Sequence, residues 1–427
     1  MKRFSITLLL IIALTMLLSG CGSDSAEKDN SKNEDKTLNI LVEGGSPALK
    51  VAEQTAQEFE KKSGYKLKID SVPYSGVYDK LQAEIVAGKA IHDVAIIDIL
   101  WFPSLVKGLD PVDDVLSSEE QSDFLPKLKD GGTVDNHLYG IPTWTNSKVL
   151  IYRKDLFEDE NNKKEFKDKY GYELKVPTNW KEYQDAAEFF TKDGMYGTTV
   201  FGANIGDTVS SWLDHAAQAG ASPLVVDENN KVLIDQKPYV ESLEMLQKIV
   251  NNQSVPADTM AIASSETAEL FNDGKLAMML VWGHFYKTAN EALPGKVGVA
   301  PMIAGSDGIG AVPGPWYQVM LKESTKKDIA KEYIQFMYEK NYLYMEQLGV
   351  ASRSSVFEKY QADEEFAHLN AINTTLDAQQ TQNRPEISEW TQIENEILAP
   401  MVQRVLSGDD AKTELSKAKK QIEQLLN

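Results

Sequence analysis

From residue 37 onward, short apolar runs alternate with longer segments in which apolar residues recur every three or four positions. The first run, 38–42, predicts a strand, and the segment 47–62 predicts a helix because its apolar residues share one face. Alternation predicts a second strand at 65–72, a second helix is expected at 77–87, and the apolar run 93–98 predicts a buried strand. The order β-α-β-α-β is typical of an α/β fold.

The same alternation continues to the end of the chain, and no internal repeat is visible. Further strands are expected at 148–153, 276–282 and 296–301. Further helices are expected at 180–191, 212–219, 239–251, 267–272, 326–340 and, with breaks at Pro400 and Ser407-Gly408, at 390–426. Strands separated by helices predict an α/β architecture whose sheets are mostly parallel.

The apolar run at 4–18 is of a different kind, because it directly follows Met1-Lys2-Arg3. It is too short to span a bilayer comfortably and ends in Leu18-Ser19-Gly20-Cys21, which predicts a signal peptide over residues 1–20. This ending resembles the site at which bacterial lipoproteins receive a lipid on cysteine and are cleaved before it. Cys21 is the only cysteine of the chain, and its thiol is readily alkylated. We expect a lipid on Cys21; a buried core cysteine and ordinary cleavage further along are the alternatives.

Residues 21–36 follow as a lipidated N-terminus and flexible tether. Ala26 is the only apolar side chain of 22–36, so this segment has nothing to bury, and its root-mean-square reach is about 20 Å. We therefore expect an exported protein, anchored by its lipid to the outer face of the cell membrane, on the periplasmic side if the cell has an outer membrane.

Length and charge limit the possible domain number and binding partners of the chain that follows the signal peptide. Almost 400 residues exceed what one hydrophobic core usually serves, so two lobes are expected. Without Lys2 and Arg3, 42 basic residues face 64 acidic ones, a net charge of −22 that would repel nucleic acid and anionic lipid surfaces. No cysteine remains for a disulfide, and we expect a monomer.

Six sequence blocks stand out along the chain. They are GKAIHDV at 88–94 with Ile97-Asp98, LYGIP at 138–142, YRKDLF at 152–157, PTNWKEY at 177–183, FNDGKLAM at 271–278 and RPEISEW at 384–390. In this order they resemble the family 1 extracellular solute-binding proteins of ABC importers. The resemblance covers nearly everything from Thr37 to Leu426, and the blocks together are specific although each is weak alone.

The resemblance implies a two-lobed fold like that of type II periplasmic binding proteins, each lobe a mostly parallel sheet flanked by helices, with the ligand cleft between the lobes. Lobe 1 is expected to comprise 37–144 and 294–345, and lobe 2 to comprise 145–293 and 346–427. Crossings between the lobes are expected near 141–148, 293–296 and 341–349. The implied function is capture of a sugar or oligosaccharide and its delivery to ABC permease subunits, without a cofactor.

Candidate ligand residues are aromatic and polar side chains at strand ends and loops, where open α/β sheets place ligands. Sugars present apolar faces and hydroxyl edges, which suit indole rings beside carboxylate or guanidinium groups. Asp98 ends a buried strand, and Glu43 precedes Gly44-Gly45, whose backbone can approach a ligand closely. The candidate set is Glu43, Tyr74, Asp98, Trp101, Trp144, Trp282, His284, Trp316 and Arg353.

Three other classes remain to be weighed. A polyamine or another cationic solute would also suit aromatic rings and carboxylates, but such a site needs several carboxylates and no arginine. A secreted glycoside hydrolase is less expected, because no hydrolase motif accompanies the acidic residues, so we predict no catalytic residue and no enzyme. The five histidines, at 92, 137, 215, 284 and 368, are too scattered to predict a metal site.

Overall fold

The computed structural model describes residues 35–203, 205–348 and 350–426, and Thr37–Asn427 forms one compact unit. The expected signal peptide and Cys21 lie outside the described residues. Among the helices that are described, none combines the length and the apolar character needed to cross a membrane.

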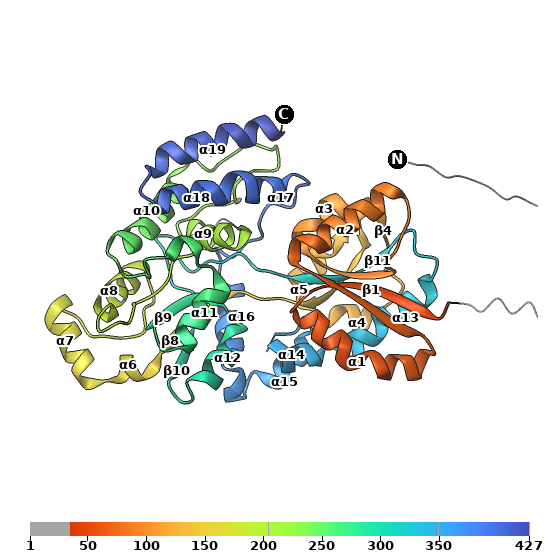
Figure 1. Ribbon diagram of the computed structural model, residues 1–427, viewed down its shortest axis with the longest axis horizontal. Helices are drawn as coiled ribbons and strands as arrows, with labels where there is room; N and C mark the ends of the chain where they lie inside the picture. Colours follow the sequence, from red (N-terminus) through yellow and green to blue (C-terminus); the bar gives the residue numbers. More distant parts are fainter. Residues whose placement is uncertain (1–34, 204, 349, 427) are drawn as a thin grey trace, which may run out of the picture. The chain divides into compact units, whose positions relative to one another are not determined.

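One sheet has six strands, and we call it, with the helices packed on it, lobe 1 (Figure 1). Its strands, in spatial order, are β2 (Lys66–Val72), β1 (Thr37–Glu43), β3 (Val94–Asp98), β11 (Trp316–Leu321) and β4 (Leu109–Asp110), and β7 (Gly140–Trp144) also pairs with β11. β1 runs parallel to β2 and β3, whereas β11 is antiparallel to β3, β4 and β7. The helices of this lobe include α1 (Pro47–Ser63), α2 (Tyr74–Ala87), α13 (Lys327–Glu339) and α14 (Tyr342–Leu348).

Helix α1 illustrates how the sequence determines these elements. The Ser46 side chain accepts a hydrogen bond from the backbone of Leu49, and Gly64 ends the helix at a φ of 75°, a left-handed conformation that favours glycine. The buried face of the helix brings Phe59 to 5.1 Å from the Tyr333 ring of α13. Capping and one apolar face therefore fix α1 on the lobe.

The second sheet has three strands and forms lobe 2 with its helices. Its order is β10 (Val297–Ala300), β8 (Lys148–Arg153) and β9 (Met278–Trp282), and both pairings are antiparallel. The longer helices of the lobe are α8 (Trp180–Phe190), α9 (Gly206–Gln218), α10 (Lys237–Asn251), α11 (Ser264–Asn272), α12 (Phe285–Ala292), α16 (His368–Leu376), α18 (Ala399–Leu406) and α19 (Ala411–Leu426).

The expected mostly parallel sheets are therefore wrong for lobe 2 and hold only for β2, β1 and β3 of lobe 1. The reason is that a fully buried strand reads as a continuous apolar run whichever way its neighbours point. The α/β class is confirmed, and so are the strands expected at 148–153, 276–282 and 296–301, which are β8, β9 and β10.

Shorter elements connect these parts. They are the 3-10 turns η1 (Ile99–Trp101), η2 (Val106–Gly108), η3 (Thr259–Ala261) and η4 (Glu364–Phe366), the helices α3 (Phe102–Leu105), α4 (Ser118–Ser122), α5 (Pro126–Gly131), α6 (Lys154–Glu158), α7 (Glu160–Tyr170), α15 (Ser354–Tyr360) and α17 (Trp390–Gln392), the strands β5 (Thr133–Val134) and β6 (His137–Leu138), and the π-helical turn η5 (Ile393–Leu398). Because α17, η5 and α18 follow one another directly, the expected break at Pro400 is absent.

The chain passes between the two sheets at more than one place. Residues 145–147 join β7 to β8, and residues 301–315 join β10 to β11. We expected the second passage near 293–296, but β10 still pairs with β8. We expected the third at 341–349, whereas the backbone N–H of Ser354 donates to Asp123 of lobe 1, and the chain reaches lobe 2 with α16, which packs on β8 and β10.

The first two passages are tied to each other, since the backbone N–H of Gly314 donates to the carbonyl oxygen of Asn146 at 3.0 Å. We call 145–147 the first crossing and 301–315 the second crossing. A hydrogen bond of this kind makes movement of one crossing affect the other.

Candidate functional site

Three of the predicted tryptophans gather at one edge of lobe 1, because β11 lies between the strands that carry the others. Trp316 pairs with Asp98 of β3 on one side and with Trp144 of β7 on the other. Its ring lies 5.8 Å from that of Trp101 and 5.2 Å from that of Trp144, and the Tyr74 ring lies 4.7 Å from Trp101. We call these four residues the aromatic cluster.

The members of the aromatic cluster differ in what they expose. Trp144 is buried and stacks on both Trp316 and Tyr344, so its ring is used in packing. Trp101 is also buried, whereas Trp316 is half-buried and Tyr74 is 37% exposed. The ring surface that can meet a solute in this arrangement therefore belongs mainly to Tyr74 and Trp316.

Asp98 lies directly beside the aromatic cluster, at the end of β3. One carboxylate oxygen accepts a hydrogen bond from the Leu100 backbone at 3.1 Å, and the other accepts one from the Tyr74 hydroxyl at 3.1 Å. Glu43, at the end of the neighbouring strand β1, is close enough for the two carboxylates to repel each other. Burial, with the charge of Asp98 adding to it, raises the pKa of Glu43 from 4.5 to about 7.

A buried arginine that the sequence analysis did not select completes this group. Arg384 donates from Nη1 to Glu394 Oε1 at 3.2 Å, and its Nη2 lies 3.9 Å from Asp98 Oδ2. Asp98 belongs to lobe 1, whereas Glu394 lies on η5, which packs on α9, α18 and α19 of lobe 2. Arg384 therefore holds charged groups of both lobes, and we call Glu43, Asp98, Arg384 and Glu394 the interlobe cluster.

The interlobe cluster contains a hydrogen-bond donor without a partner and carboxyl groups with raised pKa values. Arg384 Nε is buried and has no hydrogen-bond partner among the described residues. Burial raises the pKa of Glu394 to about 7, an effect that Arg384 opposes and Asp98 reinforces. Burial also raises the pKa of Asp98, again opposed by Arg384. Asp98 and Glu394 share one guanidinium, and Glu43 lies beside Asp98. The raised pKa values favour the neutral acid, which can both donate and accept hydrogen bonds.

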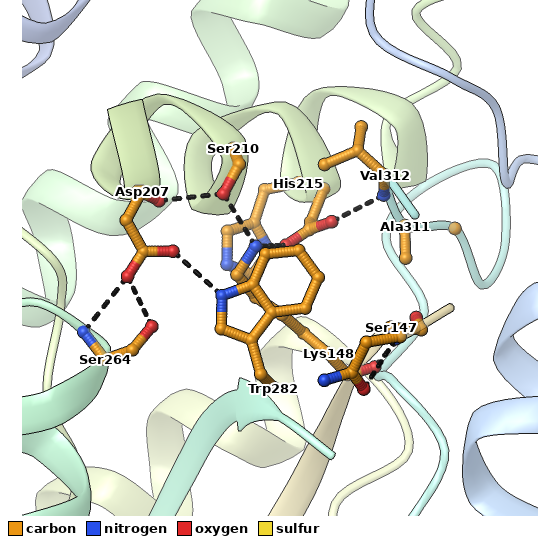
Figure 2. A network of polar contacts seen from close by, with 12 residues as sticks. Ser147, Lys148, Asp207, Ser210, His215, Ser264, Trp282, Ala311 and Val312 are labelled. Atoms are coloured by element: carbon orange, nitrogen blue, oxygen red, sulfur yellow. Dashed lines mark hydrogen bonds and ion pairs between the residues drawn. The ribbon is translucent and has the colours of Figure 1, made fainter. Parts of the chain in front are cut away.

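Trp282 lies on lobe 2, at the end of β9, and is half-buried. Its indole N–H donates to Asp207 Oδ1 at 3.0 Å, and the Lys148 ammonium lies 4.0 Å from the ring centroid (Figure 2). Asp207 stands in the first turn of α9 and is not among the predicted residues. The ring is thus held from its edge and from one face.

The remaining two candidates lie apart from the interlobe cluster. His284 follows Trp282, and its Nδ1 lies 2.5 Å from Asn146 Nδ2 of the first crossing; burial lowers the pKa of its imidazole to about 4. Arg353 donates from Nε to Asp123 at 2.7 Å and lies over the Tyr338 ring. The structure therefore does not bring Arg353 to the other candidates, and Arg384 supplies the guanidinium instead.

In chemical terms, the site offers ring faces beside hydrogen-bond donors and acceptors. No group of three or more histidine, cysteine, aspartate or glutamate residues within the described ranges could hold a metal ion. Two cavities of about 10 Å³ lie in the cores of the two lobes, and neither is lined by the interlobe cluster. The arrangement suits recognition of a polar solute rather than chemistry on it.

Comparison with known proteins agrees with this interpretation. A family model described as bacterial extracellular solute-binding protein matches residues 41–342. The arabinooligosaccharide-binding protein of Bacillus subtilis is 25% identical over 79% of this chain and 76% of its own length. The diacetylchitobiose binding protein of Streptomyces coelicolor is 24% identical over 93% of this chain and 92% of its own.

Solved structures share the fold. Maltose-bound MalE3 of T. maritima superimposes with a TM-score of 0.79 at 22% identity, over 91% of this chain and 99% of that one. The maltotriose binding protein of Thermus thermophilus gives a TM-score of 0.76 at 18% identity, over 91% of this chain and all of that one. The expected two-lobed fold of the periplasmic-binding-protein type is thereby confirmed.

Proposed function

Because the chain belongs to the bacterial extracellular solute-binding proteins, which are binding components and not enzymes, we propose that it captures a neutral sugar or oligosaccharide between its lobes. It then delivers this solute to the permease subunits of an ABC importer. The relatives support the choice of solute, since those from Bacillus subtilis and Streptomyces coelicolor are named for oligosaccharides.

The observation that carries the proposal is the position of the interlobe cluster beside the aromatic cluster. Tyr74 and Trp316 offer ring faces, while Asp98 and Arg384, from different lobes, lie close by with a donor on Arg384 still unpaired. A sugar ring stacks its C–H face on an aromatic side chain and bonds its hydroxyls to charged groups at its edge. Closure of both lobes on the solute would couple binding to the shape that a permease recognises.

The alternative of a cationic solute is disfavoured by Arg384. A polyamine site requires several ionised carboxylates without a competing cation, whereas here a buried guanidinium lies 3.9 Å from Asp98. The raised pKa values of Glu43 and Glu394 reduce the negative charge further. The hydroxyl groups of a sugar can both donate and accept hydrogen bonds here, and a neutral solute adds no charge that the site would have to compensate.

We also propose that the protein is a lipoprotein, exported by residues 1–20 and anchored through Cys21 on the outer face of the membrane. A maltooligosaccharide solute-binding lipoprotein of Streptococcus pneumoniae, 28% identical over 34% of each chain, supports this. The variant Cys21→Ser should be released into the medium or accumulate as an uncleaved precursor, measured by fractionation and intact mass. A variant that is processed and membrane-bound like the wild type would refute the anchor.

Calorimetry on residues 37–427 tests the proposed function directly. The panel comprises arabinotriose, diacetylchitobiose, maltotriose, their monosaccharides, spermidine, putrescine and divalent metal ions. Heat at micromolar or lower concentration from one carbohydrate, with none from the amines, is the expected result. Binding of the amines alone would replace the sugar by a cationic solute and keep the receptor.

A further inference from the structure

Lys148 is a fully buried lysine that the proposed capture of a sugar does not require. It is the first residue of β8, and the next three residues of that strand are Val149, Leu150 and Ile151. Its ammonium donates to Ser210 Oγ at 2.9 Å, pairs with Asp214 Oδ2 at 3.1 Å and lies 4.0 Å from the centroid of the Trp282 ring. Figure 2 shows the lysine side chain passing behind the indole.

Stability alone does not explain such a group. Taking a lysine and an aspartate out of water costs several kcal/mol per ion, and apolar side chains of similar volume in place of a buried pair are often neutral or stabilising. Asp214 is buried as completely as Lys148. The burial of Lys148 and Asp214 is better explained by the parts of the protein that this ion pair connects.

The first position is Trp282, whose ring is fixed from several directions. Its N–H donates to Asp207, and the other oxygen of Asp207 accepts from the Ser264 backbone at 3.1 Å and from the Ser264 hydroxyl. The Lys148 ammonium occupies one face, and a Cβ added at Gly314 would come within 3.1 Å of the ring, so the second crossing also touches it. No other aromatic ring packs on Trp282 in the part of the chain that is described.

The other two positions are the crossings. Lys148 directly follows the first crossing, and the second oxygen of Asp214 accepts a hydrogen bond from the Val312 backbone at 2.7 Å, in the second crossing. The ring of Trp282, the pair of buried charges and both connections between the lobes therefore form one contiguous set. We call Lys148, Asp207, Asp214 and Trp282 the Lys148 network.

We propose that Lys148 is a positioning residue: it holds the Trp282 ring in the orientation that meets the solute, and through Asp214 it links that ring to the crossings about which the lobes close. This inference rests on the proposed function. A solute that stacks on Trp282 then favours the arrangement of the crossings in which the lysine, the ring and Asp214 fit together.

The test uses the full-length protein and the double variant Lys148→Met/Asp214→Asn, which removes both charges and keeps an acceptor for the Val312 N–H. We expect a melting temperature within a few degrees of the wild type, an affinity about ten-fold lower for the best carbohydrate of the panel, and a smaller solute-induced change in small-angle X-ray scattering. A residue of merely structural importance would instead lower the melting temperature and leave the affinity of the folded fraction unchanged.

A control on lobe 1 is Lys340→Met. This lysine pairs with Glu58 at 2.6 Å and lies 5.4 Å from the Phe336 ring, and its ion pair is more exposed than that of Lys148 with Asp214. Its loss should leave affinity and scattering unchanged. An equal loss of affinity in Lys340→Met and the double variant would overturn the assignment.

Two further measurements decide the role of the ring. If Lys148 acts through Trp282, the triple variant that combines Trp282→Ala with the double variant should bind no more weakly than Trp282→Ala alone; additive losses would overturn the proposal. Without any solute, the near-ultraviolet circular dichroism due to Trp282, taken as wild type minus Trp282→Phe, should vanish in the double-variant background. An unchanged signal contradicts the positioning role even if no carbohydrate binds, whereas a wild type that binds no carbohydrate contradicts only the proposed function.

Discussion

The interlobe cluster and the Lys148 network are both buried sets of charged groups, yet they differ in how completely their bonding capacity is used. In the Lys148 network the ammonium contacts a carboxylate, a hydroxyl and an aromatic face, and both oxygens of Asp207 accept hydrogen bonds. Asp214 accepts a hydrogen bond at Oδ1, and its Oδ2 has the ion pair with Lys148 alone. In the interlobe cluster Asp98 and Glu394 share one guanidinium that keeps an unpaired Nε, and Glu43 adds a third carboxyl group beside Asp98. The first set can fix a geometry, and the second can still respond to a solute or to protons.

The largest expected effect comes from removing the one cation of the interlobe cluster. The variant Arg384→Met leaves Asp98 and Glu394 buried without a compensating cation, so the free energy of unfolding should fall by about 3 kcal/mol and carbohydrate affinity should drop strongly. Urea unfolding and calorimetry measure the two quantities. Arg353→Met is the matched control, since Arg353 pairs with Asp123 outside the site, and its affinity should not change. Equal behaviour of the two variants would remove Arg384 from the site.

A smaller effect is expected from the aromatic cluster. Trp101→Ala removes the ring on which Tyr74 packs at 4.7 Å, and Trp282→Ala removes the ring on lobe 2. Each should weaken binding by about 1 to 3 kcal/mol, the first because Tyr74 loses the buried ring that supports it and the second because lobe 2 loses a ring for the solute. Calorimetry with the same carbohydrate gives the answer. Wild-type affinity in both variants would leave the interlobe cluster as the only support for the site.

The smallest expected effect is the pH dependence of stability that Glu43 contributes to the interlobe cluster. Burial raises the pKa of Glu43 from 4.5 to about 7, so the folded protein binds more protons than the unfolded chain between these values. The contribution of Glu43 to stability is therefore lost as the pH rises from about 4.5 to 7, and it stays lost above that range.

Glu43→Gln isolates this contribution. Unfolding free energies of wild type and variant, measured in urea at pH 5, 6 and 8, should diverge, with the wild type losing stability relative to the variant as the pH rises. Glu394→Gln should behave in the same direction, because its pKa is raised to about 7 as well. Parallel curves for wild type and both variants would show that the two carboxyl groups keep ordinary pKa values.

Sequence patterns identified the parts of the site that lie at the ends of recognisable strands. Asp98 and Trp101 follow an apolar run whose end was clear, and Trp282 ends another. Strand β11 was not predicted, because Pro313-Gly314-Pro315 immediately before it suggests a loop, although the structure begins a central strand at the next residue. Trp316 was therefore chosen for its surroundings and not for its place in the sheet.

The arginine could not be selected from the sequence. Arg353 and Arg384 both lie between the helices expected at 326–340 and 390–426, and Arg384 stands in a block, RPEISEW, that had been used only to support the resemblance. What separates the two is tertiary packing: one lies beside Asp123, the other between Asp98 and Glu394. Asp207 and Lys148 were missed for the same reason, since a lysine at the start of an apolar strand predicts exposure, and its burial depends on Asp214, far along the chain.

The place of β11 in lobe 1 has a consequence for how the protein acquires its structure. β3 pairs with β1 on one side, but its other edge receives hydrogen bonds only from a strand that is synthesised more than half a chain later, after the whole of β8, β9 and β10. Such contacts between distant residues are slow to form, because the entropy of closing a long loop must be overcome first. Until then the apolar edge of β3 is a site for misassembly, and a cell that overproduces this chain depends on factors that keep nascent polypeptides apart.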